Sequence, residues 1–145
     1  MSVRTTETAG PEETEALAAD LAARLQAGDV VLISGEVGAG KTTFVRGACR
    51  ALGVRGRVTS PTFTIARRHE DGRLPVSHLD LYRLDGAPAG DPDVLEEELG
   101  PDRVAFVEWP EATAAPADPA RVAARVRLQH AGGDRRTVVI EEPAR

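Results

Sequence analysis

The chain has 145 residues, 41% of them hydrophobic, a formal net charge of −5 and one cysteine, Cys49. This length predicts a single domain over residues 1–145, and a lone cysteine excludes both a disulfide framework and a cysteine metal site. The acidic balance argues against a protein that binds nucleic acid unaided, and without a long apolar run or a signal-peptide pattern we expect a cytoplasmic protein that contacts no membrane.

The N-terminal third predicts a helix, a strand and a second helix. Residues 1–9 are polar, and we expect them to be disordered. Pro11 suits the first position of a helix, and a stripe of leucines continues the helical pattern to about Gly28. Residues 30–34 begin with four apolar residues and predict a buried strand, and residues 42–52 predict the second helix.

Residues 35–42, with the sequence GEVGAGKT, match the pattern G-x-x-x-x-G-K-[ST] of a phosphate-binding loop. They lie between a predicted strand and a predicted helix, the context that separates such a loop from a chance match. The glycines allow consecutive backbone N–H groups to point inward, and the start of the helix attracts a polyphosphate. We therefore expect Lys41, the only lysine, to reach the β- and γ-phosphates of a nucleotide and the Thr42 hydroxyl to ligate Mg²⁺.

An extended segment rich in hydroxyl groups is predicted over residues 58–65, with a break at Pro61. Nucleotide switches place a residue that senses the γ-phosphate after the phosphate-loop helix, and a plain strand is an equal alternative here. Residues 70–73 predict a hairpin turn. The return strand, residues 75–81, contains Pro75, which favours a position at the edge of the sheet.

The C-terminal half predicts one short helix and three further strands. Residues 85–93 predict a loop, which the short helix follows. Residues 104–107 form the second continuous apolar run and predict a buried strand. After a flexible stretch at residues 112–119, a turn at Gly132 predicts a terminal hairpin, with a helix over residues 121–129 as the alternative.

Two acidic residues, Glu108 and Asp80, are candidates for holding the Mg²⁺ shell of a bound nucleotide. Glu108 ends the more continuous apolar run, which is the better candidate for a central parallel strand beside the first strand. Asp80 ends the predicted edge strand. We assign Glu108 to the metal and Asp80 to orienting or deprotonating the attacking water, with an exposed carboxylate outside the chemistry as the alternative for Asp80.

Further residues carry weaker signals. Arg83 is a candidate internal arginine finger, although a surface ion pair is the more common role of such a residue. Trp109, the only tryptophan, follows Glu108 and either packs in the core, closes the nucleotide site or meets a partner. His69, His78 and His130 show no ligand spacing, so we expect them in the core or in solvent.

The nucleotide is expected to be ATP. GTPases of the Ras type read guanine through Asn-Lys-x-Asp and use Asp-x-x-Gly at the switch. The chain contains no asparagine, and no aspartate is followed by glycine three residues later. These two observations exclude a GTPase of that type.

Five motifs, GEVGAGKTTFVRG, SPTFT, HLDLYRL, EELG and VEWPE, resemble in order and spacing the TsaE (YjeE) family, over roughly residues 12–111. The resemblance implies an α/β, P-loop NTPase-like domain whose mixed, partly parallel central sheet is flanked by helices, with the antiparallel hairpin at its end. It also implies an ATPase required for the threonylcarbamoyladenosine modification of tRNA next to the anticodon. Such a protein works with the TsaB–TsaD pair, hydrolyses ATP slowly when alone, and is expected to meet tRNA only indirectly.

The resemblance also nominates site residues. Leu79, where the family usually has phenylalanine, is the one visible departure and exchanges one apolar side chain for another. Asp80 corresponds to an acid important for hydrolysis, and Thr62 lies in the family's switch segment near the γ-phosphate. The expected Mg²⁺ ligands are Thr42 and Glu108. The residues expected to hold ATP are Glu36, Val37, Gly38, Ala39, Gly40, Lys41, Thr42 and Thr43, with Thr14 and Glu111 as further positions near the nucleotide.

Two other classes of protein remain as alternatives. A small-molecule kinase would need a lid carrying several arginines, and only 37 residues follow Glu108. An ATP-gated binding protein without hydrolysis would use the same loop and the same metal, so the motifs alone leave it open.

Overall fold

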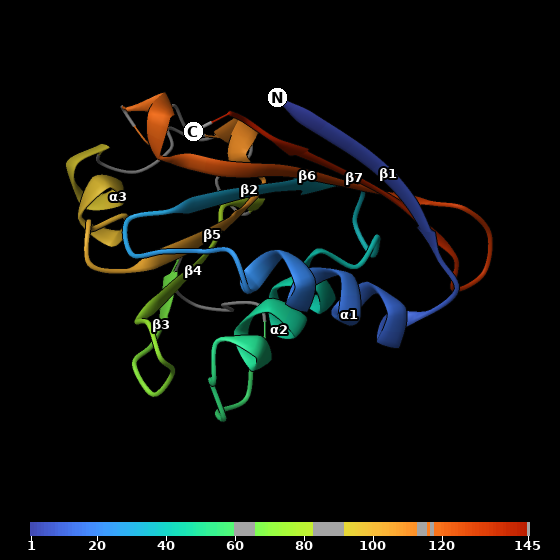
Figure 1. Cartoon of the computed structure of the whole chain (residues 1–145), viewed down its shortest axis with the longest axis horizontal. Coiled ribbons are helices and arrows are strands. Elements are labelled where there is room, and N and C mark those ends of the chain that lie inside the picture. The colour runs from blue at the N-terminus through green and yellow to red at the C-terminus, as the bar shows by residue number, and fades with distance from the viewer. Residues whose placement is uncertain (60–65, 83–91, 113–115, 117, 145) are drawn as a thin grey trace.

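A seven-stranded sheet with the strand order β1-β7-β6-β2-β5-β4-β3 forms the centre of the protein (Figure 1). The structure is a computed structural model and describes residues 1–59, 66–82, 92–112, 116 and 118–144. Strand β2 (Val30–Gly35) lies in the middle, parallel both to β5 (Val104–Glu108) and to β6 (Val122–His130). Strand β4 (Val76–Asp80) runs parallel to β5 on its far side. The central strands therefore end at one edge of the sheet.

The outer strands are antiparallel. Strand β3 (Ala66–His69) pairs with β4 at one margin, and β7 (Arg136–Glu142) pairs with β6 as the predicted terminal hairpin. Strand β1 (Ser2–Thr8) then adds to β7 and completes the other margin. This arrangement confirms the predicted mixed, partly parallel α/β fold, and it shows that the helix considered over residues 121–129 was wrong.

Helices cover the two faces of the sheet unequally. Helices α1 (Pro11–Ala22) and α2 (Lys41–Ala51) pack against each other on one face, and α3 (Pro92–Glu98) lies on the other (Figure 1). Two single turns of 3₁₀ helix, η2 (Pro110–Ala112) and η3 (Pro119–Arg121), follow β5. None of the described helices has the length and apolar character that crossing a bilayer would require.

The alternation of β2 explains the two cores. Val31 and Ile33 are fully buried beneath α1 and α2, whereas Val30 and Leu32 point to the opposite face and pack in the cluster that includes Leu95 of α3. Both faces of the central strand are thus apolar, as expected for a parallel strand covered on both sides.

Helices α1 and α2 approach each other most closely at Gly47. A Cβ atom added there would lie 2.4 Å from the carbonyl oxygen of Glu15 and 2.5 Å from its Cα. We expect Gly47→Ala to lower the free energy of unfolding by about 1–3 kcal/mol, because the two helices must separate. Gly56→Ala, where the added Cβ meets nothing within 4 Å, is the matched control. Urea unfolding checks this, and equal midpoints for the two variants would contradict it.

Residues 1–9 were expected to be disordered, but residues 2–8 form β1. Val3 and three threonines give this segment β-branched side chains, which favour an extended backbone. The strand pairs over its full length with β7. The polarity that suggested disorder is that of a strand at the margin of the sheet, where Ser2, Arg4 and Thr5 are exposed.

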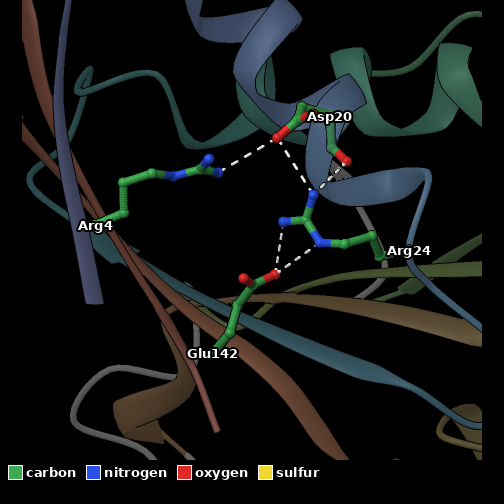
Figure 2. A network of polar contacts seen from close by, with 4 residues as sticks. All are labelled: Arg4, Asp20, Arg24 and Glu142. Atoms are coloured by element: carbon green, nitrogen blue, oxygen red, sulfur yellow. Dashed lines mark hydrogen bonds and ion pairs between the residues drawn. The ribbon is translucent and has the colours of Figure 1, made fainter. Parts of the chain in front are cut away.

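A network of exposed charges also ties β1 to the rest of the fold (Figure 2). Arg24 donates to Glu142 of β7 over 2.7 Å and to Asp20 of α1 over 3.3 Å, and Arg4 of β1 donates to Asp20 over 3.4 Å. Hydrogen bonding from Arg24 lowers the pKa of the Asp20 carboxyl. Exposed pairs of this kind contribute roughly 0–1 kcal/mol each, so the network fixes the position of β1 more than it stabilises the domain.

The prediction that residues 75–81 form an edge strand was wrong, because β4 lies between β3 and β5. Pro75 stands immediately before the first residue of β4 and so removes no hydrogen bond from the ladder. Its carbonyl oxygen accepts a hydrogen bond from the backbone N–H of Val104. The hairpin turn predicted at residues 70–73 is confirmed by the antiparallel pairing of β3 and β4.

Several predicted features lie outside the described residues. These are the segment after Thr59 that contains Thr62, the candidate finger Arg83, and nearly all of the loop predicted at residues 85–93. What the sequence predicts for these residues therefore stays a prediction.

Candidate functional site

The phosphate loop joins the end of β2 to the start of α2 through glycines that no other residue could replace without strain. Gly35 has φ 150°, and a Cβ there would lie 2.4 Å from the carbonyl oxygen of Leu128 in β6. Gly38 and Gly40 have φ values of 78° and 100°. Gly40 is the N-cap of α2 and provides no side-chain acceptor for the first amides of the helix. These amides are therefore available to an anionic ligand.

Lys41 is the first residue of α2 and lies almost completely buried beneath the loop. Its Nζ donates to the carbonyl oxygens of Gly35 and Glu36 over 2.8 and 2.7 Å. Burial lowers the pKa of this ammonium, and the carboxylates of Glu108 and Asp80 oppose that shift. The cation is thus held next to the loop, with two neighbouring carboxylates favouring its charge.

Thr42 and Glu108, the two predicted metal ligands, are in direct contact. The Thr42 hydroxyl donates to Glu108 Oε2 over 3.0 Å, and Glu108 is 2% exposed at the end of β5. His78 Nε2 lies 2.5 Å from the same carboxylate oxygen. Since a carboxylate accepts, the imidazole of His78 donates this hydrogen bond. The carboxylate is therefore fixed from both sides.

Asp80 lies beside Glu108 because β4 and β5 are parallel and the two residues are register partners. One of its carboxylate oxygens accepts the backbone N–H of Tyr82 over 3.1 Å. Both acids therefore stand at the carboxyl ends of neighbouring parallel strands, the usual place for ligand-binding residues in an open α/β sheet. Glu108 was predicted on a central strand and Asp80 on an edge strand. Both β5 and β4 lie inside the sheet, so strand position does not distinguish the two acids.

A cavity of about 330 Å³ opens where these elements meet. Eight predicted nucleotide, metal and catalytic residues surround it together with two aromatic side chains. The lining residues are Val37, Gly38, Gly40, Lys41, Thr42, Thr43, Asp80, Tyr82, Glu108 and Trp109.

Not all predicted site residues line this cavity. Ala39 is fully buried. Glu36 contributes its backbone carbonyl oxygen, which accepts a hydrogen bond from Lys41 Nζ. Thr14 is buried in α1, where its hydroxyl shares a 2.8 Å hydrogen bond with that of Thr8. Glu111 lies in η2, after β5, and lines a separate hollow of about 700 Å³ with Ser34 and residues of β6 and β7.

The aromatic side of the cavity was only partly foreseen. The rings of Tyr82 and Trp109 stack with centroids 4.9 Å apart, and Lys41 Nζ lies 4.3 Å from the centroid of the Trp109 ring. Trp109 has φ 61°, the one non-glycine residue with positive φ in the described part of the chain. Such a conformation is strained for a bulky residue and is retained where it positions a side chain.

His78 is the residue that sequence reasoning missed. The sequence left His78 in the core or in solvent; the structure buries it completely, at 0% exposure, and places its ring against Glu108. A signal was present, because residues two apart on a strand share a face and His78 therefore faces the same side as Asp80. Its other ring nitrogen, Nδ1, has no hydrogen-bond partner within the described residues.

Comparisons with known proteins agree with this geometry. A family model described as "Threonylcarbamoyl adenosine biosynthesis protein TsaE" matches residues 8–138. The "tRNA threonylcarbamoyladenosine biosynthesis protein TsaE" of Bacillus subtilis (strain 168) is 43% identical over 108 residues, which are 70% of this chain and 63% of that protein. This chain thus matches just under two thirds of the length of that relative.

Two further matches cover a larger share of the protein that is compared. A protein of the same name from Streptomyces coelicolor is 47% identical over 117 residues, which are 79% of this chain and 77% of that protein. The crystal structure of Bacillus subtilis YdiB superposes with a TM-score of 0.77 at 32% identity, covering 99% of this chain and 87% of that one.

Proposed function

Because this chain belongs to the TsaE family of threonylcarbamoyl adenosine biosynthesis proteins, we propose that it is the Mg²⁺-dependent ATPase subunit of tRNA threonylcarbamoyladenosine modification. One observation carries the proposal: Lys41, Thr42, Asp80 and Glu108 converge on a single cavity at the start of α2. A strand–loop–helix unit with a buried lysine and a metal-ligand pair is the arrangement that binds a nucleoside triphosphate with Mg²⁺.

The phosphates would bind over the first turn of α2. Backbone amides of the loop and the partial positive charge of the helix start favour a polyphosphate there. Lys41 would turn from the carbonyl oxygens of Gly35 and Glu36 to the β- and γ-phosphates. The ammonium is already desolvated, so its attraction to the phosphates is stronger than it would be in water.

Thr42 and Glu108 would hold the metal, since both supply oxygen atoms of the kind that Mg²⁺ prefers. When bound, Mg²⁺ neutralises charge on the phosphate oxygens as it develops. His78 keeps the Glu108 carboxylate in place, and Asp80 is the remaining acid near the phosphates. We assign Asp80 to orienting the attacking water and accepting its proton.

The proposed partners are TsaB and TsaD, with which this subunit would form a complex during tRNA modification. Support comes from the family membership, and the described residues of the cavity fit a subunit that depends on such partners. Lys41 is the cavity's one cationic side chain within that set, and the aromatic pair of Tyr82 and Trp109 forms part of its lining. Binding of ATP without hydrolysis is the competing outcome, and the rate measurements below decide between them.

Trp109 provides a direct test of nucleotide binding. We expect MgATP to change the intrinsic fluorescence, because Lys41 would leave its position 4.3 Å from the ring and Trp109 is the only tryptophan. GTP should titrate at appreciably higher concentrations. The variant Lys41→Ala should keep its fold and lose the response to ATP. Identical titrations with ATP and GTP would contradict the assignment to ATP.

The contact between His78 and Glu108 predicts a specific metal phenotype. We expect His78→Ala to raise the Mg²⁺ concentration needed for half-maximal ATP hydrolysis about 10-fold or more, the usual cost of removing a residue that orients a metal ligand. His78→Asn, which retains a side-chain donor, should recover part of the loss. His69→Asn on β3 is the control, because His69 is also largely buried and lies outside the cavity. A uniform loss of activity without a shift in Mg²⁺ dependence would show that His78 serves packing only.

A further inference from the structure

The charges of the chain are strongly segregated along the sequence. Residues 44–79 contain seven arginines and two acidic residues, whereas the rest of the chain contains 11 basic and 21 acidic residues. The net charge of −5 therefore conceals a positive segment inside an acidic protein. This segment begins within α2 and ends in β4.

The fold brings most of these arginines to one place. Arg50, in the last turn of α2, donates to the carbonyl oxygens of Val54 and Gly56 over 3.0 and 2.6 Å. The loop that follows α2 therefore folds back along the end of the helix. In Figure 1 this loop lies at the bottom of the view, next to the hairpin of β3 and β4.

Two contacts join the loop to the hairpin. The backbone N–H of Arg55 donates to Asp71 Oδ2 over 2.9 Å, and Arg67 of β3 donates to the Thr59 hydroxyl over 3.3 Å. Helix end, loop and hairpin thus form one continuous surface. We call it the arginine surface and define it by Arg46, Arg50, Arg55, Arg57 and Arg67.

These cations are available to a ligand. The residues Arg50, Arg55, Arg57 and Arg67 are exposed, and none of the four has an acidic side chain of the described residues within ion-pair distance. Asp71, the nearest acid along the hairpin, is occupied by the backbone N–H of Arg55, a hydrogen bond that lowers its pKa. Arg46 pairs with Glu15 over 3.9 Å, and Asp71 keeps its own negative charge, so the excess positive charge of the surface comes from the four exposed arginines.

The chemistry of the surface favours a polyanion over a protein. Protein interfaces need an apolar or aromatic centre, and the large hydrophobic side chains exposed among the described residues are Met1, Val3, Val37 and Tyr82. None of them belongs to the arginine surface. Phosphate groups, in contrast, need only cations and N–H donors, and the guanidinium fork matches them bidentately.

Although the net charge and the family resemblance led us to expect only indirect contact with tRNA, we propose that the arginine surface binds the phosphate backbone of RNA directly, and that the RNA is tRNA. Only the choice of tRNA rests on the proposed function; the preference for phosphates rests on the charges themselves. Helix α2 is about 16 Å long and has the nucleotide cavity at its start and the arginine surface at its end. The two sites are therefore distinct and can be disabled separately.

Binding of fluorescently labelled bulk tRNA to the full chain, measured by anisotropy between 50 and 200 mM salt, tests the proposal. We expect the double variant Arg55→Glu with Arg57→Glu to weaken binding about 30-fold at roughly 0.1 M salt, and to lower the salt slope by about 1.5–2. The milder pair Arg55→Gln with Arg57→Gln should show a smaller loss in the same direction. The matched control is Arg125→Glu with Arg127→Glu, two exposed arginines of β6 with the same change in charge.

MgATP binding, followed through Trp109, should be unchanged in all these variants and shows that they fold. Several results would overturn the proposal: no tRNA binding by the unaltered chain at 50 mM salt, equal losses in test and control pairs, or loss of TsaB–TsaD binding by the test pair with tRNA binding intact. The third of these results would show that the arginine surface binds a protein and not RNA. In each case intact ATP binding would leave the proposed function standing, whereas failure of the unaltered chain to bind ATP would refute that function alone.

Discussion

Addition of the TsaB–TsaD pair is expected to raise the rate of ATP hydrolysis by this chain about 10³–10⁵-fold, the range observed when a phosphate-loop protein gains a positioned arginine from a partner. Fast phosphoryl transfer needs a positioned water, exclusion of solvent and neutralisation of charge on the transferred group. The described cavity provides the carboxylate of Asp80 for the water and Lys41 as its one cation. A partner that supplies or orders an arginine would complete the set.

The measurement is steady-state ADP production at saturating ATP and Mg²⁺, first alone and then with the partner pair. A chain with Lys41→Ala in the same complex controls for contaminating ATPases. A brisk rate alone that the partners leave unchanged would refute this expectation and indicate a self-sufficient enzyme. No ADP in either condition, with normal nucleotide binding, would instead favour ATP-gated assembly without hydrolysis.

The second large effect separates the two acids of the cavity. We expect Asp80→Asn to bind MgATP normally and to slow hydrolysis by about 10²-fold or more, because the water loses its proton acceptor. We expect Glu108→Gln to weaken the Mg²⁺ dependence of nucleotide binding, because a charged oxygen ligand is lost. Both changes preserve side-chain shape, so residue 108 stays next to Thr42 and His78 and residue 80 stays next to the backbone N–H of Tyr82.

Nucleotide binding and single-turnover hydrolysis, each titrated with Mg²⁺, distinguish the two phenotypes. If they come out reversed, Asp80 is the metal ligand and Glu108 the base. The contact between Thr42 and Glu108 argues for the assignment as given, since the loop hydroxyl and the strand carboxylate lie close enough that one metal ion could be held by both.

Local sequence signals predicted the centre of this fold well. Strand β2, helix α2 and strand β5 were evident from apolar runs and from the phosphate-loop pattern, because these elements are buried on both sides and carry little ambiguity. The same signals predicted that Lys41, Thr42 and Glu108 would meet. The loop holds Lys41 and Thr42 just beyond the end of β2, and the parallel pairing of β2 with β5 brings Glu108 to the same edge of the sheet.

The remaining features depend on long-range pairing that local patterns do not encode. Residues 2–8 become a strand because β7 offers an unpaired edge. Strand β4 lies inside the sheet because β3 pairs with its outer edge. The positions proposed for Thr14 and Glu111 came from resemblance alone, and the fold places both residues outside the cavity lining. The role of His78 needed the lateral register between β4 and β5, which brings its ring to Glu108.

The pairing of β1 with β7 also constrains the order in which the protein can form during synthesis. Among the described strands, β1 comes first in the sequence and its partner β7 comes last, with Ser2 opposite Glu142. Strand β2 likewise waits for β5 and β6, which are encoded more than 60 residues later. The sheet therefore closes only after β7 has been made, and until then the apolar faces of α1 and α2 lack part of their cover. During that interval a nascent chain exposes unpaired strand edges and apolar helix faces, the features that favour aggregation.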